Sequence, residues 1–395
     1  NLKKAAVVVV SSAVAEFNSE LLEARNKGLP IVKRSEMLAE LMRLNSNIAI
    51  AGTHGKTTTT SLIADIFVRA KLDPTFIIGG KILGQENKSI LGTGDYLIVE
   101  ADESDASFLH LNPEISVVTN IDNDHLDYYE NNLEKLDSTF LQFLENLPFF
   151  GSAIICTDSE RSKKVFENLS RPKISYGFDK KADYFIKDLK QQAKFQKFKI
   201  IRNSTGKEIS LELTISGKHN ALNATAAFIV AQKAGINTKV IKDSFKNFGG
   251  VSRRLEFKAD LKIGGKSVTL IDDYGHHPTE MKATISALNN ITDGKLYVIF
   301  QPHRYTRTRD NFEEFQRSLD IADVPIVTDI YSAGEEPIPG VSSKNFTNSK
   351  IKYIKSIRSV PIFIKNNIKP GDTVLTLGAG DITLLGPQIL KYLND

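Results

Sequence analysis

The sequence has 395 residues, of which 41% are hydrophobic and 25% charged, and its formal net charge is +4. This length allows two or three ordinary domains, and the composition is typical of a globular protein. The 51 basic residues nearly balance the 47 acidic ones and form no run that could follow a nucleic-acid backbone. We therefore expect no nucleic-acid partner.

Membrane insertion and disulfide bonding are not expected either. No apolar run approaches the ~20 residues that span a bilayer, and the opening residues do not have the pattern of a signal peptide. The single cysteine, Cys156, excludes an intrachain disulfide and fits a reducing compartment. We expect a cytoplasmic protein.

Apolar runs rich in valine and isoleucine alternate with amphipathic stretches along almost the whole chain. Helices are predicted over residues 59–70 and 311–322, among others, and strands over residues 5–12, 47–53, 96–102, 115–121, 152–158, 268–274, 296–301, 324–330 and 373–379. Consecutive apolar positions are typical of parallel strands covered on both faces, so we expect α/β layers. Residues 184–215 differ, because their pattern indicates three short antiparallel strands with a turn at residues 203–208.

The segment "GTHGKTTTT", which begins at Gly52, lies between a predicted strand and a predicted helix. Backbone N–H groups and the dipole at a helix N-terminus attract phosphate, and Gly52 and Gly55 allow close approach. Lys56 can reach the β- and γ-phosphates, and the Thr57 hydroxyl can bind Mg²⁺. The first glycine of the common phosphate loop is replaced by Ile50, so this is not the loop of the common GTPases. The alternative is a threonine-rich helix start capped by its own hydroxyls.

Acidic residues follow two of the predicted strands, at the sheet edge where ligands gather. The two groups are Glu100, Asp102 and Glu103, and Asp122, Asp124 and His125. Because Mg²⁺ prefers oxygen ligands and keeps several waters, one carboxylate with phosphate oxygens would suffice to bind it. The histidine would fit a second metal position. The alternative is that these are solvated loop residues, which is least expected for the glutamate that continues a buried run.

Asn220 and Asn223 lie three residues apart in a predicted helix that begins near Asn220, so both side chains lie on one face. Their amides can donate and accept, as the reading of a purine edge requires. The alternative is a helix cap followed by a polar turn.

Two clusters of polar residues follow strands in the last third of the chain, and both should face one cleft. The first comprises Asp272, Asp273, Tyr274, His276 and His277, and the second His303, Arg304, Tyr305, Arg307 and Arg309. Arg304 and Arg307 could clamp a carboxylate; alternatively, they cover a helix surface and pair with Asp310 or Glu313. The histidine pair with two aspartates could hold zinc, although adjacent histidines and the lack of a nearby cysteine argue against it.

Eight segments occur in an order that closely resembles the Mur ligases: "GTHGKTTTT", "VEADESDASFLHL", "TNIDNDHLDYY", "GKHNALNATAA", "GVSRRLEF", "DDYGHHPTE", "QPHRYTRTRDNF" and "LGAGDIT". The resemblance runs from Ala5 over nearly the whole chain. It implies an α/β protein of three domains: the remainder of an N-terminal UDP-binding Rossmann-like domain (1–46), a central P-loop ATPase domain (47–252) and a C-terminal Rossmann-like domain (253–395). The glycine-rich loop that opens the family's first domain is not in the sequence, so we expect that domain to be only partly present.

The resemblance also implies ATP-dependent formation of an amide bond. The segments are most similar to the branch that joins L-alanine to the carboxylate of UDP-N-acetylmuramate for peptidoglycan synthesis. The γ-phosphoryl group of ATP would convert the carboxylate to an acyl phosphate, and the amine of L-alanine would displace phosphate. ATP and Mg²⁺ are the implied cofactors, in a monomer or homodimer.

The residues of this sequence that match the family's motifs take roles by that resemblance. Catalytic roles are implied for Lys56, His125, His276 and His277. The metal ligands would be Thr57, Glu100 and His125. ATP would contact Gly52, Thr53, His54, Gly55, Lys56, Thr57, Thr58, Asn220, Asn223, Arg254 and Asp273. Substrate would contact Tyr274, His277, His303, Arg304 and Arg307. Several Mur ligases carry a carbamylated lysine where this sequence has Phe140, with Lys135 a turn earlier, so we expect no carbamate.

Other functions remain open at this point. A P-loop switch or motor would hydrolyse ATP without an amino acid and would not use the histidine and arginine clusters. An ATP-binding remnant would bind nucleotide without turnover. A muropeptide-recycling ligase or a folate polyglutamylating ligase would run the same chemistry on another substrate.

Overall fold

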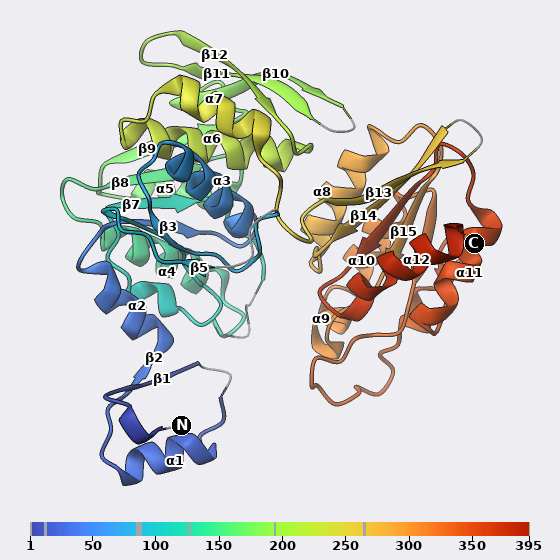
Figure 1. Cartoon of the computed structure of the whole chain (residues 1–395), viewed down its shortest axis with the longest axis horizontal. Coiled ribbons are helices and arrows are strands. Elements are labelled where there is room, and N and C mark those ends of the chain that lie inside the picture. The colour runs from blue at the N-terminus through green and yellow to red at the C-terminus, as the bar shows by residue number, and fades with distance from the viewer. Residues whose placement is uncertain are drawn as a thin grey trace.

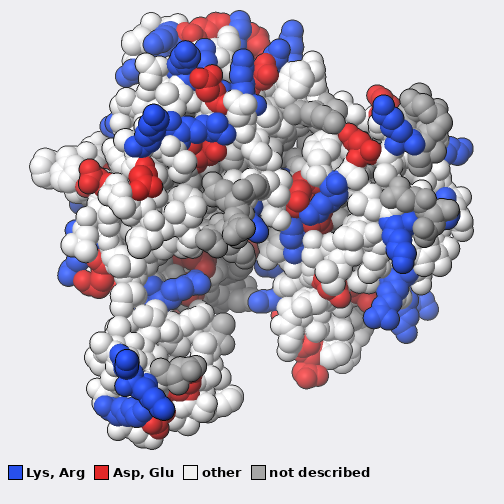
Figure 2. Space-filling view, in the orientation of Figure 1, with Lys and Arg blue, Asp and Glu red and all other residues white. Residues whose placement is uncertain are grey.

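The computed structural model describes residues 2–11, 14–83, 89–124, 126, 128–192, 195–263 and 266–394. Figure 1 shows three parts, each with its own sheet: a small N-terminal part, a large central part and a C-terminal part beside it. Lys and Arg are interspersed with Asp and Glu over the face drawn in Figure 2. In the described ranges, no helix is both long and apolar enough to cross a membrane.

The N-terminal part has two parallel strands, with Val8 opposite Ile31. Its elements are η1 (Leu2–Lys4), β1 (Val8–Val10), α1 (Ser19–Asn26), β2 (Ile31–Lys33) and α2 (Arg34–Met42). The strand predicted over residues 5–12 is therefore only three residues long. Val9 is 47% exposed, so this apolar run is not the strand covered on both faces that its composition predicted.

The central part is built on a ten-stranded sheet in the order β12-β11-β10-β9-β8-β7-β3-β6-β4-β5. Its strands are β3 (Ser46–Ala51), β4 (Thr75–Ile77), β5 (Ser89–Ile90), β6 (Tyr96–Glu100), β7 (Ile115–Val118), β8 (Ser152–Cys156), β9 (Lys173–Gly177), β10 (Tyr184–Gln191), β11 (Gln196–Arg202) and β12 (Lys207–Leu213). The stretch from β9 to β4 is parallel. Strand β11 is antiparallel to both of its neighbours, β10 and β12, which confirms the prediction for residues 184–215.

Helices cover both faces of this sheet, which explains the consecutive apolar positions in its strands. They are α3 (Lys56–Arg69), η2 (Ser107–His110), α4 (Leu133–Glu145), α5 (Glu160–Asn168), α6 (Lys218–Lys233) and α7 (Thr238–Asn247). In β3, Ile48 and Ile50 pack with α3, α6 and α7, while Ala49 and Ala51 pack on the other face with α4.

The C-terminal part has a six-stranded sheet in the order β13-β14-β18-β15-β16-β17, parallel except for β13. Its elements are β13 (Glu256–Ile263), β14 (Lys266–Asp273), α8 (Pro278–Asn289), β15 (Leu296–Phe300), α9 (Tyr305–Asp310), α10 (Phe312–Leu319), β16 (Val324–Val327), η3 (Ser343–Phe346), β17 (Lys352–Tyr353), η4 (Ile357–Ser359), α11 (Val360–Asn367), β18 (Thr373–Leu377), η5 (Asp381–Leu384) and α12 (Leu385–Asn394). Helices α8 and α10 cover one face, and α11 and α12 cover the other.

The loops at the carboxyl ends of the strands in the two larger parts meet each other. Asp122, which follows β7, accepts a hydrogen bond from Thr279 in the first turn of α8 (Oγ1 to Oδ2, 2.6 Å). Arg307 in α9 lies 3.4 Å from Asp124 of the same central loop. The topology thus brings the polar clusters of both parts to one cleft, as the sequence predicted.

Candidate active site between the central and C-terminal parts

The predicted phosphate loop joins β3 to α3. Gly55 is the N-cap of α3 with φ +83°, and a Cβ atom there would lie 2.6 Å from the side-chain oxygen of Asn223. Asn120, which follows the neighbouring strand β7, fixes the loop. Its side-chain amide accepts a hydrogen bond from the His54 N–H and donates one to the His54 carbonyl, both at 2.9 Å. Any other residue at position 55 would strain the left-handed backbone and displace the Asn223 side chain. The glycine leaves the loop backbone open at the helix N-terminus.

Lys56, at the start of α3, is held by a buried carboxylate. Its Nζ donates to both oxygens of Glu103 (2.7 and 2.9 Å) and to the Gly52 carbonyl (2.6 Å). Glu103 is 1% exposed. Burial lowers the pKa of Lys56, but the charge and hydrogen bond of Glu103, together with the charges of Asp102 and Glu100, outweigh burial and raise this pKa above its ordinary value. Lys56 is therefore a cation whose charge is matched by Glu103.

Thr57 and Glu100, two of the predicted magnesium ligands, lie together. The Thr57 hydroxyl donates to Glu100 Oε2 (3.2 Å), and Glu100 Oε1 accepts from the Gly79 N–H (2.7 Å). Burial raises the pKa of Glu100, so a bound cation would relieve the cost of its charge. These oxygen donors fit Mg²⁺. The third predicted ligand, His125, lies outside the described residues.

A cavity of about 430 Å³ lies in front of this loop, between the two larger parts. Lys56, Thr57 and Glu100 line it from the central part, and Tyr274 and His276 line it from the C-terminal part. The structure thus brings candidates for phosphoryl transfer and for substrate binding to one space.

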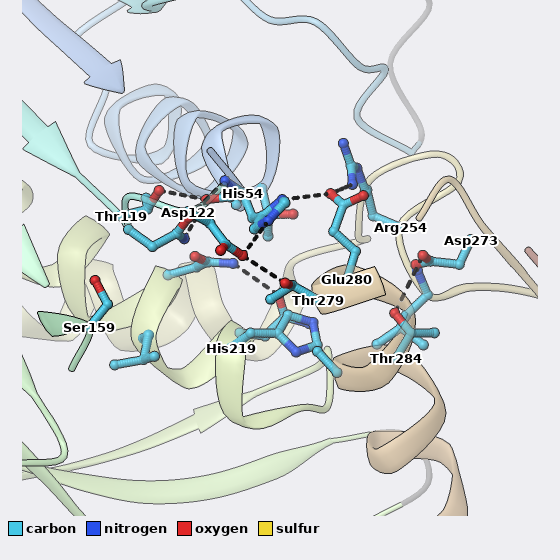
Figure 3. Close-up of a pocket in the computed structure, with 18 of the residues that line it drawn as sticks. His54, Thr119, Asp122, Ser159, His219, Arg254, Asp273, Thr279, Glu280 and Thr284 are labelled. Carbon is cyan, nitrogen blue, oxygen red and sulfur yellow. Dashed lines mark hydrogen bonds and ion pairs between the residues drawn. The ribbon is translucent and has the colours of Figure 1, made fainter. Parts of the chain in front are cut away.

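A second cavity, of about 330 Å³, continues from the phosphate loop toward α6 and α8 (Figure 3). Several residues predicted to bind ATP line it, namely His54, Gly55, Thr58, Asn220, Asn223, Arg254 and Asp273. The amide of Asn223 donates to the Asn220 oxygen (3.2 Å), so both asparagines lie on one buried face of α6, as predicted.

Asp273 holds the backbone that lines this cavity. Its carboxylate accepts hydrogen bonds from the backbone N–H groups of Leu255 (2.7 Å) and Gly275 (2.8 Å). Burial raises the pKa of Asp273 to about 6. Asp273 therefore shapes the wall of the cavity, and a direct contact with ATP stays a prediction.

Glu280, which was not among the predicted site residues, lies at the centre of the contact between the two parts. Its carboxylate is 3.2 Å from Arg254 Nη1 and 3.5 Å from His54 Nδ1, and it accepts from the His276 N–H (3.1 Å). Burial raises the pKa of Glu280. The hydrogen bond and charge of His54 and the charge of Arg254 together outweigh this effect and hold the pKa of Glu280 well below its usual range. The position of Glu280 four residues after His276, in the first turn of a helix, could have indicated that it contacts this histidine.

His54 connects the two parts through carboxylates. Its Nε2 lies 3.2 Å from Asp122 Oδ2, and its Nδ1 faces Glu280. Burial lowers the pKa of His54, but hydrogen bonds with these two carboxylates raise it to about 9. His54 is therefore a cation at neutral pH.

The histidines of the C-terminal part are neutral. The rings of His276 and His303 are 6.0 Å apart, and His303 stacks on Tyr331 at 5.5 Å. Burial lowers the pKa of His276 and of His303 to about 4. Neutral imidazoles can accept a proton from a substrate amine.

The zinc site considered for the first cluster is wrong, because its members point to different partners. Asp272 accepts from Thr376 (2.7 Å) and Asp273 from backbone N–H groups, while His276 faces the Tyr274 carbonyl (3.2 Å). The fourth member, His277, lies with its ring 5.1 Å from that of His54.

Arg304 and Arg307 do not share a helix face. Arg304 is exposed and precedes α9 with φ +70°, whereas Arg307 is in α9 with its side chain 12% exposed beside Asp124. The surface-pairing alternative is also wrong, since Asp310 pairs with Arg309 (2.7 Å) and Glu313 with Arg317 (3.5 Å). A positive φ outside glycine is unusual and is found frequently at functional sites.

Comparisons with known proteins agree with this architecture. Family models match three ranges: the Mur ligase family catalytic domain at residues 1–46, the Mur ligase middle domain at 50–231 and the Mur ligase glutamate ligase domain at 253–380. The UDP-N-acetylmuramate–L-alanine ligase of Vesicomyosocius okutanii subsp. Calyptogena okutanii is 45% identical over 400 residues, which cover 99% of this chain and 85% of that protein. The ligase of the same name from Ruthia magnifica is 45% identical over 403 residues with the same coverage.

The chain belongs to the Mur ligase family. Among solved structures, the UDP-N-acetylmuramate–alanine ligase MurC of Thermotoga maritima superposes with a TM-score of 0.82 at 24% identity, over 98% of this chain and 85% of that one. The MurF ligase of Thermotoga maritima in complex with ADP has a TM-score of 0.74 at 17% identity, over 100% and 96%. These two likenesses establish the three-part Mur ligase fold.

Phe140, which the resemblance places where several Mur ligases have a carbamylated lysine, is part of the core. Phe140 is fully buried, with its ring 5.2 Å from that of Phe108. Lys135, a turn earlier, pairs with exposed Glu130 (2.8 Å). The absence of a carbamate at this position stays a prediction.

Proposed function

We propose that this Mur ligase joins L-alanine to the carboxylate of UDP-N-acetylmuramate, with conversion of ATP to ADP and phosphate, in peptidoglycan precursor synthesis. The observation that carries the proposal is 45% identity over 99% of the chain to ligases named for this reaction. The cleft supports it, because the phosphate loop faces the neutral His276 and the arginines Arg253 and Arg254 across one cavity.

In the first step, a carboxylate oxygen of the UDP-sugar attacks the γ-phosphorus of ATP, and ADP leaves. Lys56 would turn from Glu103 to the β- and γ-phosphates. Thr57 and Glu100 would hold Mg²⁺, which when bound would neutralise phosphate charge. Catalysis of this step rests on position and charge, for which the buried cation and the loop N–H groups are suited.

In the second step, the amine of L-alanine attacks the carbonyl carbon and phosphate leaves. His276 and His303 are the candidates to take the proton that the ammonium group must lose, because both imidazoles are neutral and have an unprotonated nitrogen to accept it. Arg304 and Arg307 are the candidates to bind the alanine carboxylate. Closure of the C-terminal part over the cleft would keep water from the acyl phosphate.

We place the UDP-sugar in a third cavity, of about 410 Å³, between α2 and the central sheet. Arg34 and Ser35 line one side of it, and Lys56 and Glu100 line the other. A substrate in this position would present its carboxylate to the γ-phosphate. The cation of Arg34 is the candidate partner for the diphosphate.

We also propose domains at residues 1–46, 47–252 and 253–395, since each of the three family models falls within one of these limits. The three sheets follow the same division, except that β3 of the central sheet begins at Ser46. A cytoplasmic location is proposed because the reaction consumes ATP. The monomer and the homodimer both stay open, and gel filtration with light scattering separates them.

Phosphate release with ATP, UDP-N-acetylmuramate and each amino acid in turn tests the proposal, with mass spectrometry of the product. We expect release that depends on L-alanine and a product heavier by one alanyl residue. Release without any amino acid would indicate a switch or motor. Turnover only with a peptide in place of alanine would indicate a recycling ligase, and nucleotide binding without turnover a remnant.

A further inference from the structure

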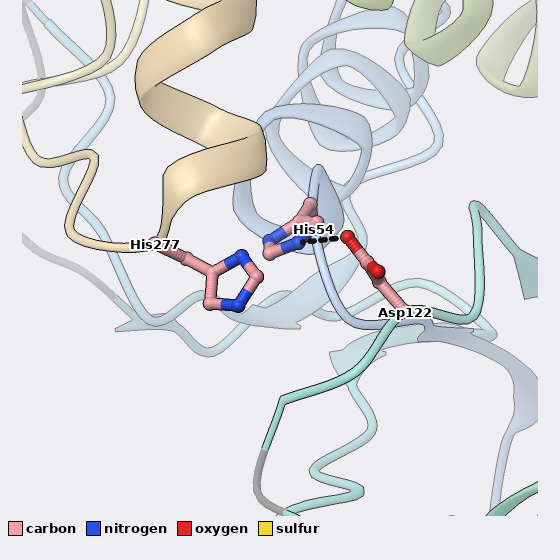
Figure 4. Close-up of side chains that lie close together, drawn as sticks. All are labelled: His54, Asp122 and His277. Carbon is pink, nitrogen blue, oxygen red and sulfur yellow. Dashed lines mark hydrogen bonds and ion pairs between the residues drawn. The ribbon is translucent and has the colours of Figure 1, made fainter. Parts of the chain in front are cut away.

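Three potential metal ligands from different segments converge beside the phosphate loop. His54 belongs to that loop, Asp122 follows β7, and His277 is the N-cap of α8 in the C-terminal part (Figure 4). One ligand atom from each lies within 4.8 Å of the others. The group is separate from Thr57 and Glu100, the magnesium ligands proposed above.

His277 is the unusual member of this group. It is 5% exposed, and neither of its ring nitrogens has a hydrogen-bond partner within the described part of the chain. Buried polar atoms are nearly always hydrogen-bonded, so two unsatisfied nitrogens indicate a missing partner. Figure 4 shows the His277 ring directed toward His54 and Asp122.

The other two members are already oriented by their neighbours. Behind His54, the Glu280 carboxylate faces Nδ1 at 3.5 Å, which leaves Nε2 directed to Asp122. A carboxylate behind a histidine is the usual way in which proteins orient a histidine ligand toward a metal. Thr279 donates to Asp122 and restrains its side chain in the same way (2.6 Å).

We propose that His54, Asp122 and His277 form a binding site for a zinc-class divalent cation that connects the central and C-terminal parts. Two imidazoles and one carboxylate, with water in the fourth position, are a donor set that suits Zn²⁺, whereas Mg²⁺ prefers oxygen ligands alone. The cation takes the place of the proton on His54 Nε2, so zinc binding releases protons. Bound zinc fixes the phosphate loop against α8.

The test is calorimetric titration of zinc chloride into the full chain, without nucleotide or Mg²⁺. We expect one zinc ion per chain, and at least about 10-fold weaker binding in His277→Ala and in Asp122→Asn, because each loses a direct ligand. His110→Ala, which removes an exposed histidine, is the matched control and should bind zinc like the wild type. Glu100→Gln should also leave this binding unchanged, which separates the site from the proposed magnesium site.

Two further measurements keep the test decisive. Thermal unfolding in EDTA shows whether each variant folds. Asp122 lies in the central part and His277 in the C-terminal part, so a folding defect in one of the two variants leaves the other informative. Cobalt chloride should give a visible absorption band that both ligand variants lose. The proposal is wrong if the wild type binds no zinc, or if folded His277→Ala and Asp122→Asn bind it with wild-type affinity. Neither result bears on the ligase reaction, since no substrate is present.

Discussion

Replacing Lys56 by alanine should remove both activity and stability, because Lys56 balances the charge of a buried carboxylate. Its Nζ makes two contacts with Glu103, at 2.7 and 2.9 Å, and Glu103 is 1% exposed. Loss of one partner from a buried ion pair costs about 3–5 kcal/mol, because the remaining charge is left unpaired. For a domain the size of the central part, this corresponds to a fall in Tm of roughly 6–20 °C.

The double variant Lys56→Ala/Glu103→Gln separates the two effects. It removes the unpaired charge, so most of the lost Tm should return, while phosphate release should stay at least about 10²-fold below the wild type because the cation at the phosphates is missing. Lys135→Ala is the matched control: Lys135 pairs with exposed Glu130, so its loss should change Tm little.

The test is to measure Tm and the rate of phosphate release for four proteins: the wild type, Lys56→Ala, the double variant and Lys135→Ala. The Lys56–Glu103 pair does not stabilise the fold if Lys56→Ala unfolds at the wild-type temperature, or if the added Glu103→Gln change restores none of the lost Tm. Activity of Lys56→Ala within a few fold of the wild type would remove Lys56 from the mechanism.

Three other outcomes are expected. Glu100→Gln should raise the Mg²⁺ concentration required for half-maximal activity, and a Mg²⁺ titration that superimposes on the wild type would exclude Glu100 as a ligand. Arg304→Lys and Arg307→Lys should each raise KM for L-alanine more than KM for ATP, because lysine cannot replace the bidentate fork; unchanged values for both would place the clamp elsewhere. The His54 pKa is raised from 6.5 to about 9, so its contribution to the free energy of unfolding is fully present below pH 6.5 and is lost as pH rises through about 9. Tm should therefore fall over that range in the wild type, and the fall should be smaller in Asp122→Asn.

The sheets were largely predictable from the sequence, and the reasons for the misses are physical. Strands such as Leu296–Phe300 are buried on both faces and show as consecutive apolar residues. Strand β13 (Glu256–Ile263) was missed because it lies at a sheet edge and alternates charged with apolar residues. Strands β5 and β17 are two residues long, too short for any periodic pattern.

Several residues that line the cleft could be predicted from the sequence, but their hydrogen-bond and ion-pair partners could not. Motifs at strand ends identified Lys56 and His276, yet nothing local shows that Lys56 pairs with Glu103, which is 47 residues away. The contact between Asp122 and Thr279 joins residues 157 positions apart, and only the packing of the two parts creates it.

The divergence of His276 and His277 has a local cause that the spacing did not show. The backbone of His277 is extended, with φ −113° and ψ 146°. In extended backbone, neighbouring side chains point to opposite sides, so adjacent histidines could not serve one metal. His276 lines the cavity of about 430 Å³ in front of the phosphate loop, and His277 faces His54.

We propose that this Mur ligase holds the phosphates of ATP in order to activate a carboxylate. The decisive measurement is turnover of UDP-N-acetylmuramate labelled with oxygen-18 in that carboxylate, with L-alanine and unlabelled ATP. Transfer through an acyl phosphate predicts one labelled oxygen in each released phosphate, detected by mass spectrometry. Phosphate released without label, in a reaction that still forms the amide, would contradict the account.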